Sequence, residues 1–201
     1  MAKTYDRAYF EKWYRDPRHA VSSRHELERK VALAVAMAEY YLGREVRCVL
    51  DVGCGEAPWR APLKRLRPKL DYLGLDASEY AVARYGRTRN LRLAKFGNLE
   101  HLRFAHAFDL IVCADTLHYI RADELRRGLR GLVEMLDGVA FIELFAREDA
   151  PEGDRHGYLA RPARWYLREF RAAGLLPCGT HCYLGSRLRN RTAALETNAA
   201  G

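Results

Sequence analysis

The sequence has 201 residues, which is long enough for one ordinary domain and short for two. Hydrophobic residues make up 49% of it and charged residues 30%, a balance that excludes a disordered chain. Its formal net charge of +8 comes from arginines spread along the chain without a dense basic run, so we interpret it as a solvated surface rather than a nucleic-acid-binding one.

Helical and strand-like segments alternate along the chain. A short helix is expected within residues 5–25, which are rich in aromatic and basic side chains. Apolar periodicity and end signals predict further helices over residues 26–42, after Pro58, over residues 123–135 and from Pro162 to Gly174. Short apolar runs predict strands over residues 48–52, 72–75, 90–94, 108–114 and 139–145, and two strand-like segments follow over residues 176–184 and 188–195.

This alternation predicts βαβ units in a mainly parallel sheet. Right-handed crossovers bring the C-terminal ends of the strands to one edge, where α/β sheets bind their ligands. No repeat, low-complexity tract or Gly/Pro/Ser-rich linker interrupts the pattern, so we expect a single domain over residues 1–201.

Neither the apolar runs nor the cysteines indicate export, a membrane span or a metal. The longest apolar run, residues 31–38, is far too short to cross a bilayer, and the first residues lack the apolar core of a signal peptide, so we expect a cytoplasmic protein. The five cysteines are an odd number, which argues against a disulfide framework. Cys178, His181 and Cys182 lie close together, but no second ligand pair with zinc spacing accompanies them, so we predict no metal site.

The residues that indicate chemistry stand where two of the strands end. The strand over residues 48–52 runs into Gly53-Cys54-Gly55, a turn that lets ligand atoms approach bare backbone amides near a helix N-terminus. Asp76 closes the next strand, at a position where a carboxylate accepts the ribose hydroxyls of a nucleoside. Together the two features indicate a ligand that contains a nucleoside.

A nicotinamide dinucleotide is disfavoured as that ligand. Its binding turn has a third glycine, and this chain has Pro58 there. The turn is also acidic, with Asp51 and Glu56 on either side of the glycines. A negative turn suits a ligand that carries an ammonium and a sulfonium better than one that carries two phosphates, which favours S-adenosylmethionine.

Three segments of the chain resemble the motifs of class I S-adenosylmethionine-dependent methyltransferases. Residues 49–55 (Val-Leu-Asp-Val-Gly-Cys-Gly) are similar to the first motif, residues 72–78 to the second, and residues 108–119 to the strand and turn that line the methyl-transfer site. The resemblance implies a three-layer α/β sandwich around a mostly parallel, seven-stranded sheet whose last strand is antiparallel. It also implies a methyltransferase core over residues 46–196 and an N-terminal helical lid over residues 1–25.

The resemblance further implies which residues hold the cofactor. Gly53 and Gly55 would contact its methionyl part, and Asp115 would lie beside its sulfonium. The full set of candidate cofactor-binding residues is Tyr9, Trp13, Asp51, Gly53, Cys54, Gly55, Asp76, Ala77, Gly97, Asn98, Leu99, Ala114 and Asp115. Ala57 stands where many members of the class have glycine, so the turn is expected to differ slightly there.

The methyl acceptor is expected beyond the sulfonium. His118 and Tyr119 follow the fourth strand towards the reacting edge, where His118 would act as a general base or orient the acceptor. Packing in the wall of the site is the alternative for both. Tyr14 in the N-terminal segment, and His156 and Tyr158 in the loop after the fifth strand, are the candidates for contact with the acceptor, with an ordinary solvated loop as the alternative for the last two.

The turn after the fourth strand also bears on the acceptor. Its sequence, Ala-Asp-Thr-Leu over residues 114–117, lacks the prolines of the Asn/Asp-Pro-Pro-aromatic turn that usually holds the exocyclic amines of bases. We therefore predict transfer to an O or N nucleophile of a small molecule, with S-adenosylhomocysteine as the product of the cofactor. An RNA methyltransferase, which the positive charge would suit, and a non-catalytic adenosylmethionine-binding protein are the alternatives.

Residues 5–25 need an explanation of their own, since a βαβ core is complete without them. Aromatic residues such as Tyr9 and Trp13 are followed closely by basic ones such as Arg18 and His19. Aromatic faces attract a sulfonium, and basic side chains hold a carboxylate. We predict that this segment closes over the site as a lid and excludes water, with packing of its aromatic residues against the core as the alternative.

Overall fold

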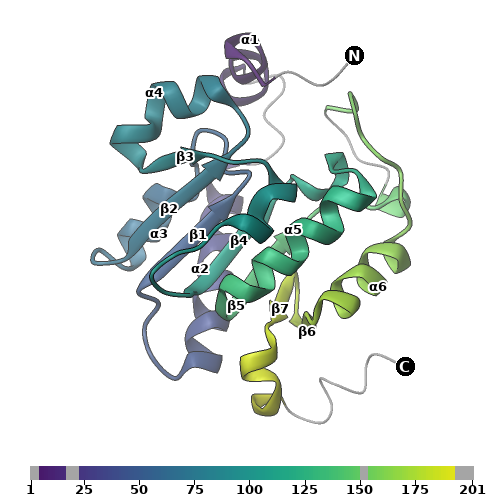
Figure 1. Cartoon of the computed structure of the whole chain (residues 1–201). Coiled ribbons are helices and arrows are strands. Elements are labelled where there is room, and N and C mark those ends of the chain that lie inside the picture. The colour runs from purple at the N-terminus through teal and green to yellow at the C-terminus, as the bar shows by residue number, and fades with distance from the viewer. Residues whose placement is uncertain (1–4, 17–22, 150–153, 193–201) are drawn as a thin grey trace.

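The computed structural model describes residues 5–16, 23–149 and 154–192 (Figure 1). Arg18 and His19, which the sequence assigned to the lid, lie outside the described residues. The strands are β1 (Cys48–Val52), β2 (Asp71–Asp76), β3 (Leu91–Leu93), β4 (Phe108–Ala114), β5 (Leu136–Glu143), β6 (Leu176–Gly179) and β7 (Cys182–Leu184). The α-helices are α1 (Arg7–Phe10), α2 (Arg24–Leu42), α3 (Arg60–Leu66), α4 (Glu79–Arg89), α5 (Ala122–Met135) and α6 (Ala163–Ala173). A π-helical turn, η1 (Glu11–Arg15), continues α1, and 3-10 turns are η2 (Phe96–His101), η3 (Leu117–Tyr119), η4 (Arg147–Asp149) and η5 (Ser186–Arg191).

The strands form one sheet in the order β3-β2-β1-β4-β5-β7-β6. Neighbours from β3 to β5 pair in parallel, whereas β7 runs antiparallel to both β5 and β6. This confirms the predicted mostly parallel, seven-stranded sheet with an antiparallel last strand. The chain adds strands outward from β1 on one side and then from β4 on the other, so β1 and β4 flank the switch point at which such sheets bind ligands.

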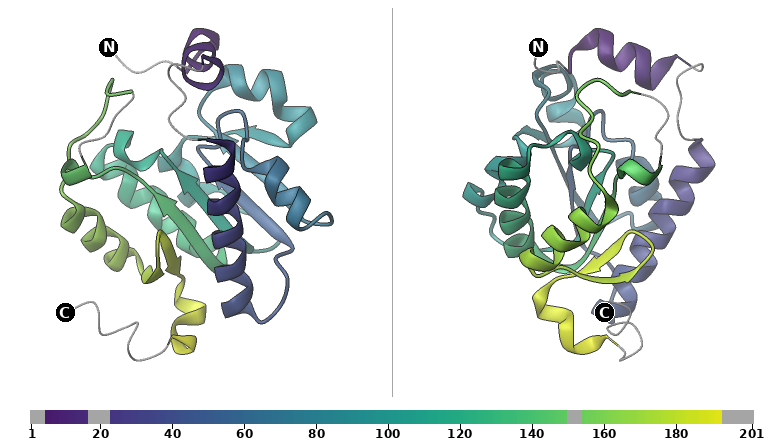
Figure 2. Two further views of the ribbon diagram at one scale, coloured as in Figure 1. Left: turned by 180° about the vertical axis from the view of Figure 1, so that it is seen from behind. Right: turned by 90° about the vertical axis from the view of Figure 1, so that its right-hand side faces the viewer.

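Helices cover both faces of the sheet and give the predicted three-layer sandwich (Figures 1 and 2). α2 and α3 pack on one face, and α5 and α6 on the other. Alternate residues of β1 show the division, because Val49 packs with α2 and α3 while Leu50 packs with α5 and α6. Strands that are buried on both faces are nearly continuous apolar runs, which is why β1, β4 and β5 gave clear strand signals.

The helix ends follow local capping rules. α2 begins after Ser23, whose hydroxyl accepts a hydrogen bond from the backbone N–H of Glu26, and it ends at Gly43 with a left-handed φ of 68°. Gly174 ends α6 in the same way, with φ of 94°. Both glycine ends agree with the sequence prediction. α3 begins at Arg60 rather than at Pro58.

The prediction for the last part of the chain is partly wrong. Residues 176–184 form two strands rather than one, because the chain reverses at His181, whose φ is +58°. Within residues 188–195, the described part belongs to the 3-10 turn η5 and not to a strand. Leu188 is the buried residue of this turn, and Arg191 donates a hydrogen bond of 2.6 Å to the backbone oxygen of Tyr41 at the end of α2. A strand buries alternate residues, whereas this segment buries Leu188 alone, which is typical of a helical turn at the surface.

Within the described residues, no helix is long and apolar enough to span a membrane. The cysteines are buried and reduced. In the same part of the chain, no three side chains of the His, Cys, Asp or Glu type gather in a way that could hold a metal ion.

Candidate functional site

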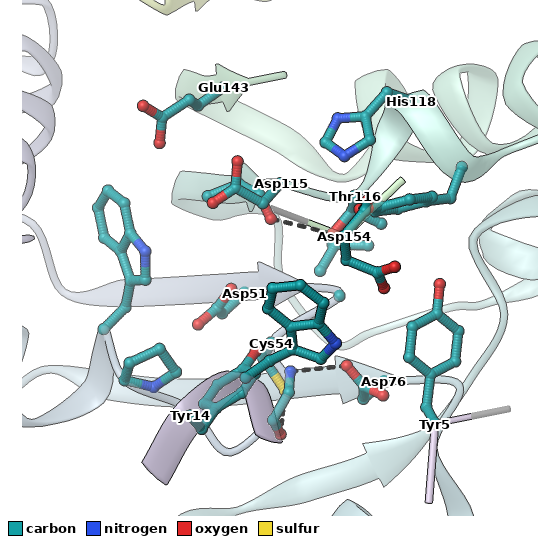
Figure 3. A pocket seen from close by; sticks show the side chains of 18 of the residues that line it. Tyr5, Tyr14, Asp51, Cys54, Asp76, Asp115, Thr116, His118, Glu143 and Asp154 are labelled. Carbon is teal, nitrogen blue, oxygen red and sulfur yellow. Dashed lines mark hydrogen bonds between the residues drawn. The ribbon is translucent and has the colours of Figure 1, made fainter. Parts of the chain in front are cut away.

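A cavity of about 430 Å³ opens at the C-terminal ends of β1, β2, β4 and β5 (Figure 3). Its wall includes Gly53 after β1, Asp76 at the end of β2, Asp115 after β4, Glu143 at the end of β5 and Trp13 from the N-terminal segment. A cavity of this size accommodates a small-molecule ligand or cofactor. It lies at the edge of the sheet where the sequence placed the site.

The turn after β1 presents bare backbone to this cavity. Gly53 and Gly55 have left-handed φ values of 73° and 53°. A Cβ atom at Gly53 would lie 2.2 Å from Oγ1 of Thr116, and one at Gly55 would lie 2.4 Å from the hydroxyl of Tyr14. Both conformation and space therefore require glycine. Ala57 follows with φ of 59°, so it adopts a conformation that favours glycine at a cost of about 1–2 kcal/mol.

Asp76 is fixed by the backbone around it. Its Oδ2 accepts a hydrogen bond of 2.6 Å from the N–H of Gly55, and its Oδ1 accepts one of 2.7 Å from the N–H of Ser78. Burial raises the pKa of this carboxyl, and the backbone N–H groups oppose that rise. Each oxygen keeps a second lone pair, so the carboxylate can still accept two hydroxyls of a ligand.

Asp51 lies deeper in the cavity wall and is only 2% exposed. It accepts a hydrogen bond of 2.6 Å from the hydroxyl of Tyr72. Burial raises the pKa of Asp51 to about 7, against the lowering effect of the Tyr72 hydroxyl, and the nearby Asp76 adds to the rise. A cation bound beside Asp51 would therefore favour its charged form near neutral pH.

The ends of β4 and β5 supply two more carboxylates. Asp115 has a left-handed φ of 54°, and its N–H donates a hydrogen bond of 2.9 Å to the backbone oxygen of Glu143. Burial, and then the charge of Glu143, raise the pKa of Asp115 to about 6. Glu143 forms an ion pair of 2.7 Å with Lys30 of α2, which also pairs with Glu26 at 3.0 Å.

His118 and Tyr119 both lie in the cavity wall, where the sequence placed them. His118 is 2% exposed, and its Nδ1 accepts a hydrogen bond of 3.3 Å from the backbone N–H of Phe145. The hydroxyl of Tyr119 donates a hydrogen bond of 2.7 Å to the backbone oxygen of Asp154. Burial raises the pKa of Tyr119, which keeps it neutral. Tyr158 contributes its ring to the same wall, 5.7 Å from that of His118.

The N-terminal segment docks across the glycine turn through buried and polar contacts. Phe10 is 2% exposed and stacks on Tyr80 at 5.7 Å between ring centroids. Arg15 forms an ion pair of 2.5 Å with Glu56, and the hydroxyl of Ser78 donates a hydrogen bond of 2.6 Å to the backbone oxygen of Tyr5. Phe10 thus packs against the core, while other aromatic residues of the segment face the cavity.

The structure brings most of the predicted site residues to this one cavity. Those that line it are Tyr9, Trp13, Tyr14, Asp51, Gly53, Cys54, Gly55, Asp76, Ala77, Ala114, Asp115, His118, Tyr119 and Tyr158. Four predicted residues lie elsewhere and are Gly97, Asn98, Leu99 and His156.

The structure places those four residues outside the cavity wall. Leu99 is fully buried in the core, and a Cβ atom at Gly97 would lie 3.1 Å from Cβ of Glu124, because η2 packs against α5. Asn98 points outward, and the loop that carries His156 leaves its side chain exposed. The residues from this part of the chain that do line the cavity are Ala94 and Phe96.

Sequence reasoning missed several residues of the wall. Glu143 and Phe145 belong to the predicted strand over residues 139–145, and the rule that strand ends meet at one edge was sufficient to find them. Thr116 follows Asp115 and was available from the same signal. Tyr5 belongs to the aromatic segment over residues 5–25 but was not selected within it. Lys30 gave no signal, because a helical period alone does not tell which side chain reaches a site.

Comparison with known sequences gives two matches. Residues 49–138 match the family described as a methyltransferase domain. The chain is 26% identical over 133 residues to malonyl-[acyl-carrier protein] O-methyltransferase of Bacillus cereus, a stretch that covers 63% of this chain and 48% of that enzyme. The match therefore spans about half the length of this relative.

Solved structures of the same fold include a sugar N-methyltransferase and a plantazolicin methyltransferase. The sugar N-methyltransferase KedS8 from a Streptoalloteichus species has a TM-score of 0.63 and 18% identity, over 79% of this chain and 87% of that chain. The plantazolicin methyltransferase BpumL, in complex with a pentazolic analogue and S-adenosylhomocysteine, has a TM-score of 0.58 and 16% identity, over 82% of this chain and 71% of that chain. These likenesses establish the fold.

Proposed function

Because the chain has the seven-stranded fold of class I methyltransferases and carries a methyltransferase domain over residues 49–138, we propose that it moves a methyl group from S-adenosylmethionine to an O or N nucleophile of a small molecule. S-adenosylhomocysteine is then the product of the cofactor. The observation that carries the proposal is the cavity in which the glycine turn at residues 53–55 and the fixed carboxylate of Asp76 face the same space (Figure 3).

The residues of the cavity fit the cofactor chemically. Asp76 would accept the ribose hydroxyls, and the bare backbone at Gly53 and Gly55 would admit the methionyl part. Asp51 would face the ammonium, and the ring of Trp13 would attract the sulfonium. Carboxylates outnumber basic side chains in the wall, which suits a ligand with two positive groups better than one with phosphates; they are Asp51, Asp76, Asp115, Glu143 and Asp154, against Arg24 and Lys30.

The remaining residues of the cavity position the acceptor. The bound cofactor supplies an electrophilic methyl group, and its in-line displacement is accelerated mainly by holding the nucleophile in place. His118 has its ring orientation set by the hydrogen bond from Phe145. We assign His118 and Tyr119 to the acceptor side, as groups that orient the nucleophile. Because Nδ1 of His118 already accepts the N–H of Phe145, its Nε2 carries the proton and acts as a donor towards the acceptor.

Calorimetry tests the cofactor. We expect S-adenosylhomocysteine to bind and NAD not to bind. Release of S-adenosylhomocysteine from S-adenosylmethionine in the presence of acceptors then tests transfer. Binding of NAD in place of S-adenosylhomocysteine would contradict the proposal, and binding without transfer to any acceptor would support the non-catalytic alternative.

Replacing Asp76 by alanine should weaken the binding of S-adenosylhomocysteine by roughly ten- to a hundredfold. Hydrogen bonds to a charged group contribute about 1.5–3 kcal/mol, which corresponds to that range. Calorimetry on Asp76→Ala measures the loss, with circular dichroism to check the fold. Asp71→Ala is the matched control, since Asp71 is exposed at the opposite end of β2. Unchanged affinity in Asp76→Ala would show that Asp76 does not bind the ribose hydroxyls.

Bound S-adenosylhomocysteine should slow amide exchange in the segment Glu11–Arg15 if this segment closes over the cofactor. The ion pair between Arg15 and Glu56 helps to hold the segment, and an exposed pair is worth about 0.2–1 kcal/mol. Arg15→Ala should therefore speed exchange there by about two- to fivefold. Arg7→Ala is the control, because Arg7 of α1 pairs with Glu11 and makes no ion pair with the core among the described residues. Equal amide exchange with and without the ligand would show that the segment packs against the core and does not close over the cofactor.

A further inference from the structure

Four of the carboxylates of the cavity fall into two groups, and the fifth, Asp154, comes from the loop before α6. Figure 3 shows Asp51 and Asp76 on the side of the glycine turn, with Asp115 and Glu143 displaced from them towards His118. The first group belongs to β1 and β2, which would hold the cofactor. The second group stands after β4 and β5, on the side where the acceptor must lie. The part of the cavity around Asp115 and Glu143, called the acceptor half, therefore determines which acceptor can bind.

Asp115 is the carboxylate of that half without a partner. Its backbone is held by the hydrogen bond to Glu143, but its side chain makes no hydrogen bond and no ion pair with any residue that the structure describes. The side chain is accessible from the cavity, although protein atoms surround it closely enough for burial to raise the pKa of its carboxyl to about 6. A carboxylate in such a place is stabilised by a bound cation.

The neighbouring charges do not balance Asp115. The charge of Lys30 acts on Asp115, but its ammonium is shared between Glu143 at 2.7 Å and Glu26 at 3.0 Å. Arg24, which also lines the cavity, forms an ion pair of 3.1 Å with Glu28. The acceptor half therefore carries excess negative charge, which attracts a cation and repels a phosphate or carboxylate.

The rest of this half is aromatic. The rings of His118 and Tyr119 lie 4.2 Å apart between centroids, and those of Phe145 and Tyr158 each lie 5.7 Å from His118. Aromatic faces enclose an apolar or flat body and also attract a cation. An unpaired carboxylate beside an aromatic wall is the arrangement expected for binding an organic ammonium.

We propose that the acceptor is an amine, which Asp115 holds through its ammonium group against the aromatic wall, and that the amine nitrogen receives the methyl group. This inference rests on the proposed methyltransferase function. An alkylammonium has a pKa near that of lysine, about 10.4, so it enters as a cation at neutral pH.

The transfer balances without a further reactant. The ammonium first gives one N–H proton to the carboxylate of Asp115 and becomes a neutral amine. The lone pair of the nitrogen then forms the new N–C bond, while the bond from the methyl carbon to sulfur breaks and leaves its electron pair on sulfur. The positive charge moves from sulfur to the methylated nitrogen, and Asp115 returns its proton to water.

Matched pairs of amine and alcohol test the proposal on the whole protein saturated with S-adenosylhomocysteine. The probes are 2-phenylethylamine and 2-phenylethanol, tyramine and tyrosol, and glucosamine and glucose, with binding measured by calorimetry. In at least one pair, the amine should bind about tenfold or more tightly than its alcohol, the size of one charge-assisted hydrogen bond. With S-adenosylmethionine, release of S-adenosylhomocysteine should follow the same preference.

Asp115→Asn removes the charge and keeps the shape, and asparagine adopts the left-handed conformation at least as readily as aspartate. This variant should lose about tenfold or more in amine affinity while its affinity for S-adenosylhomocysteine stays within about twofold. Asp71→Asn, at the far end of β2, is the control and should change neither.

The possible failures are distinct. Amines that bind no better than their alcohols, or a preference that survives Asp115→Asn, would overturn the amine inference while the cofactor assignment stands. Asp115→Asn could instead weaken the binding of S-adenosylmethionine more than that of S-adenosylhomocysteine and leave amine binding unchanged. In that case Asp115 interacts with the sulfonium, and the amine inference is wrong. Wild-type protein that does not bind S-adenosylhomocysteine would instead refute the proposed function.

Discussion

Replacing Gly55 by valine should abolish the binding of S-adenosylhomocysteine, a loss of more than about a hundredfold, while the protein remains folded. Gly55 has a φ of 53°, where a β-branched residue is strongly disfavoured. Its Cβ would also lie 2.4 Å from the hydroxyl of Tyr14, on the side of the turn that faces the cavity. The N–H of Gly55 is a donor to Asp76, so a shifted turn would displace that carboxylate as well.

The comparison that isolates the effect is Gly174→Val. Gly174 is also left-handed, with φ of 94°, but a Cβ there would meet nothing within 4 Å and the residue lies at the end of α6. This control should lose stability and keep binding. Circular dichroism and calorimetry on both variants, with Gly55→Ala as a milder change, separate strain from blockage. Full binding by Gly55→Val would show that the turn is not the cofactor cradle.

Asp51→Asn should increase the stability of the free protein at alkaline pH and weaken the binding of S-adenosylhomocysteine. The raised pKa of about 7 for Asp51 means that the folded protein keeps a proton that the unfolded chain has released above pH 4. Asp51 therefore lowers the stability of the wild type progressively as the pH rises to about 7. Asparagine keeps the acceptor for the Tyr72 hydroxyl and has no such titration.

The expected size follows from two pH units at about 1.36 kcal/mol each. The free energy of unfolding of Asp51→Asn, relative to wild type, should increase by roughly 3 kcal/mol between pH 5 and pH 8. Urea unfolding at the two pH values measures it. The charged groups that face Asp51 are Asp76 and, if ionised, Tyr72, Cys54 and Cys113, and these are present in both proteins. A difference that does not change with pH would mean that Asp51 is charged throughout.

The same variant should bind S-adenosylhomocysteine at least about tenfold more weakly at pH 8, because the ammonium of the ligand would lose its carboxylate. At pH 5, where Asp51 of the free wild type is protonated, the gap between the two proteins should narrow. Calorimetry at both pH values decides the matter. Equal affinities at pH 8 would contradict the assignment of Asp51 to the ammonium.

Local signals were enough to predict the sheet and the cofactor half of the site. Doubly covered strands such as β1 and β4 are apolar throughout, and the ends of neighbouring parallel strands must meet. The turn at residues 53–55 and Asp76 therefore came together as expected. The glycines that end α2 and α6 were equally visible, since their left-handed conformation leaves little choice of residue.

Contacts between distant segments were not predictable in this way. The turn η2 lies against α5 because Gly128 leaves room for it, and a Cβ there would be 2.2 Å from the ring of Phe96. This packing turns Leu99 into the core and leaves Ala94 and Phe96 at the cavity. The two strands β6 and β7 were merged for a different reason, because the left-handed residue of the turn between them is His181 rather than a glycine or an asparagine.

The cavity wall has a consequence for how the protein withstands degradation. Tyr5 and Tyr158 face the same cavity although they lie far apart in the sequence, and helices, turns and strand ends between them supply the remaining wall. A ligand in the site therefore contacts segments from residue 5 to residue 158, which lie together only in the folded domain. Ligand at a hundred times its Kd then stabilises that domain as one unit, by about 2.7 kcal/mol. Cleavage by proteases that requires this unit to unfold is then slowed by roughly a hundredfold.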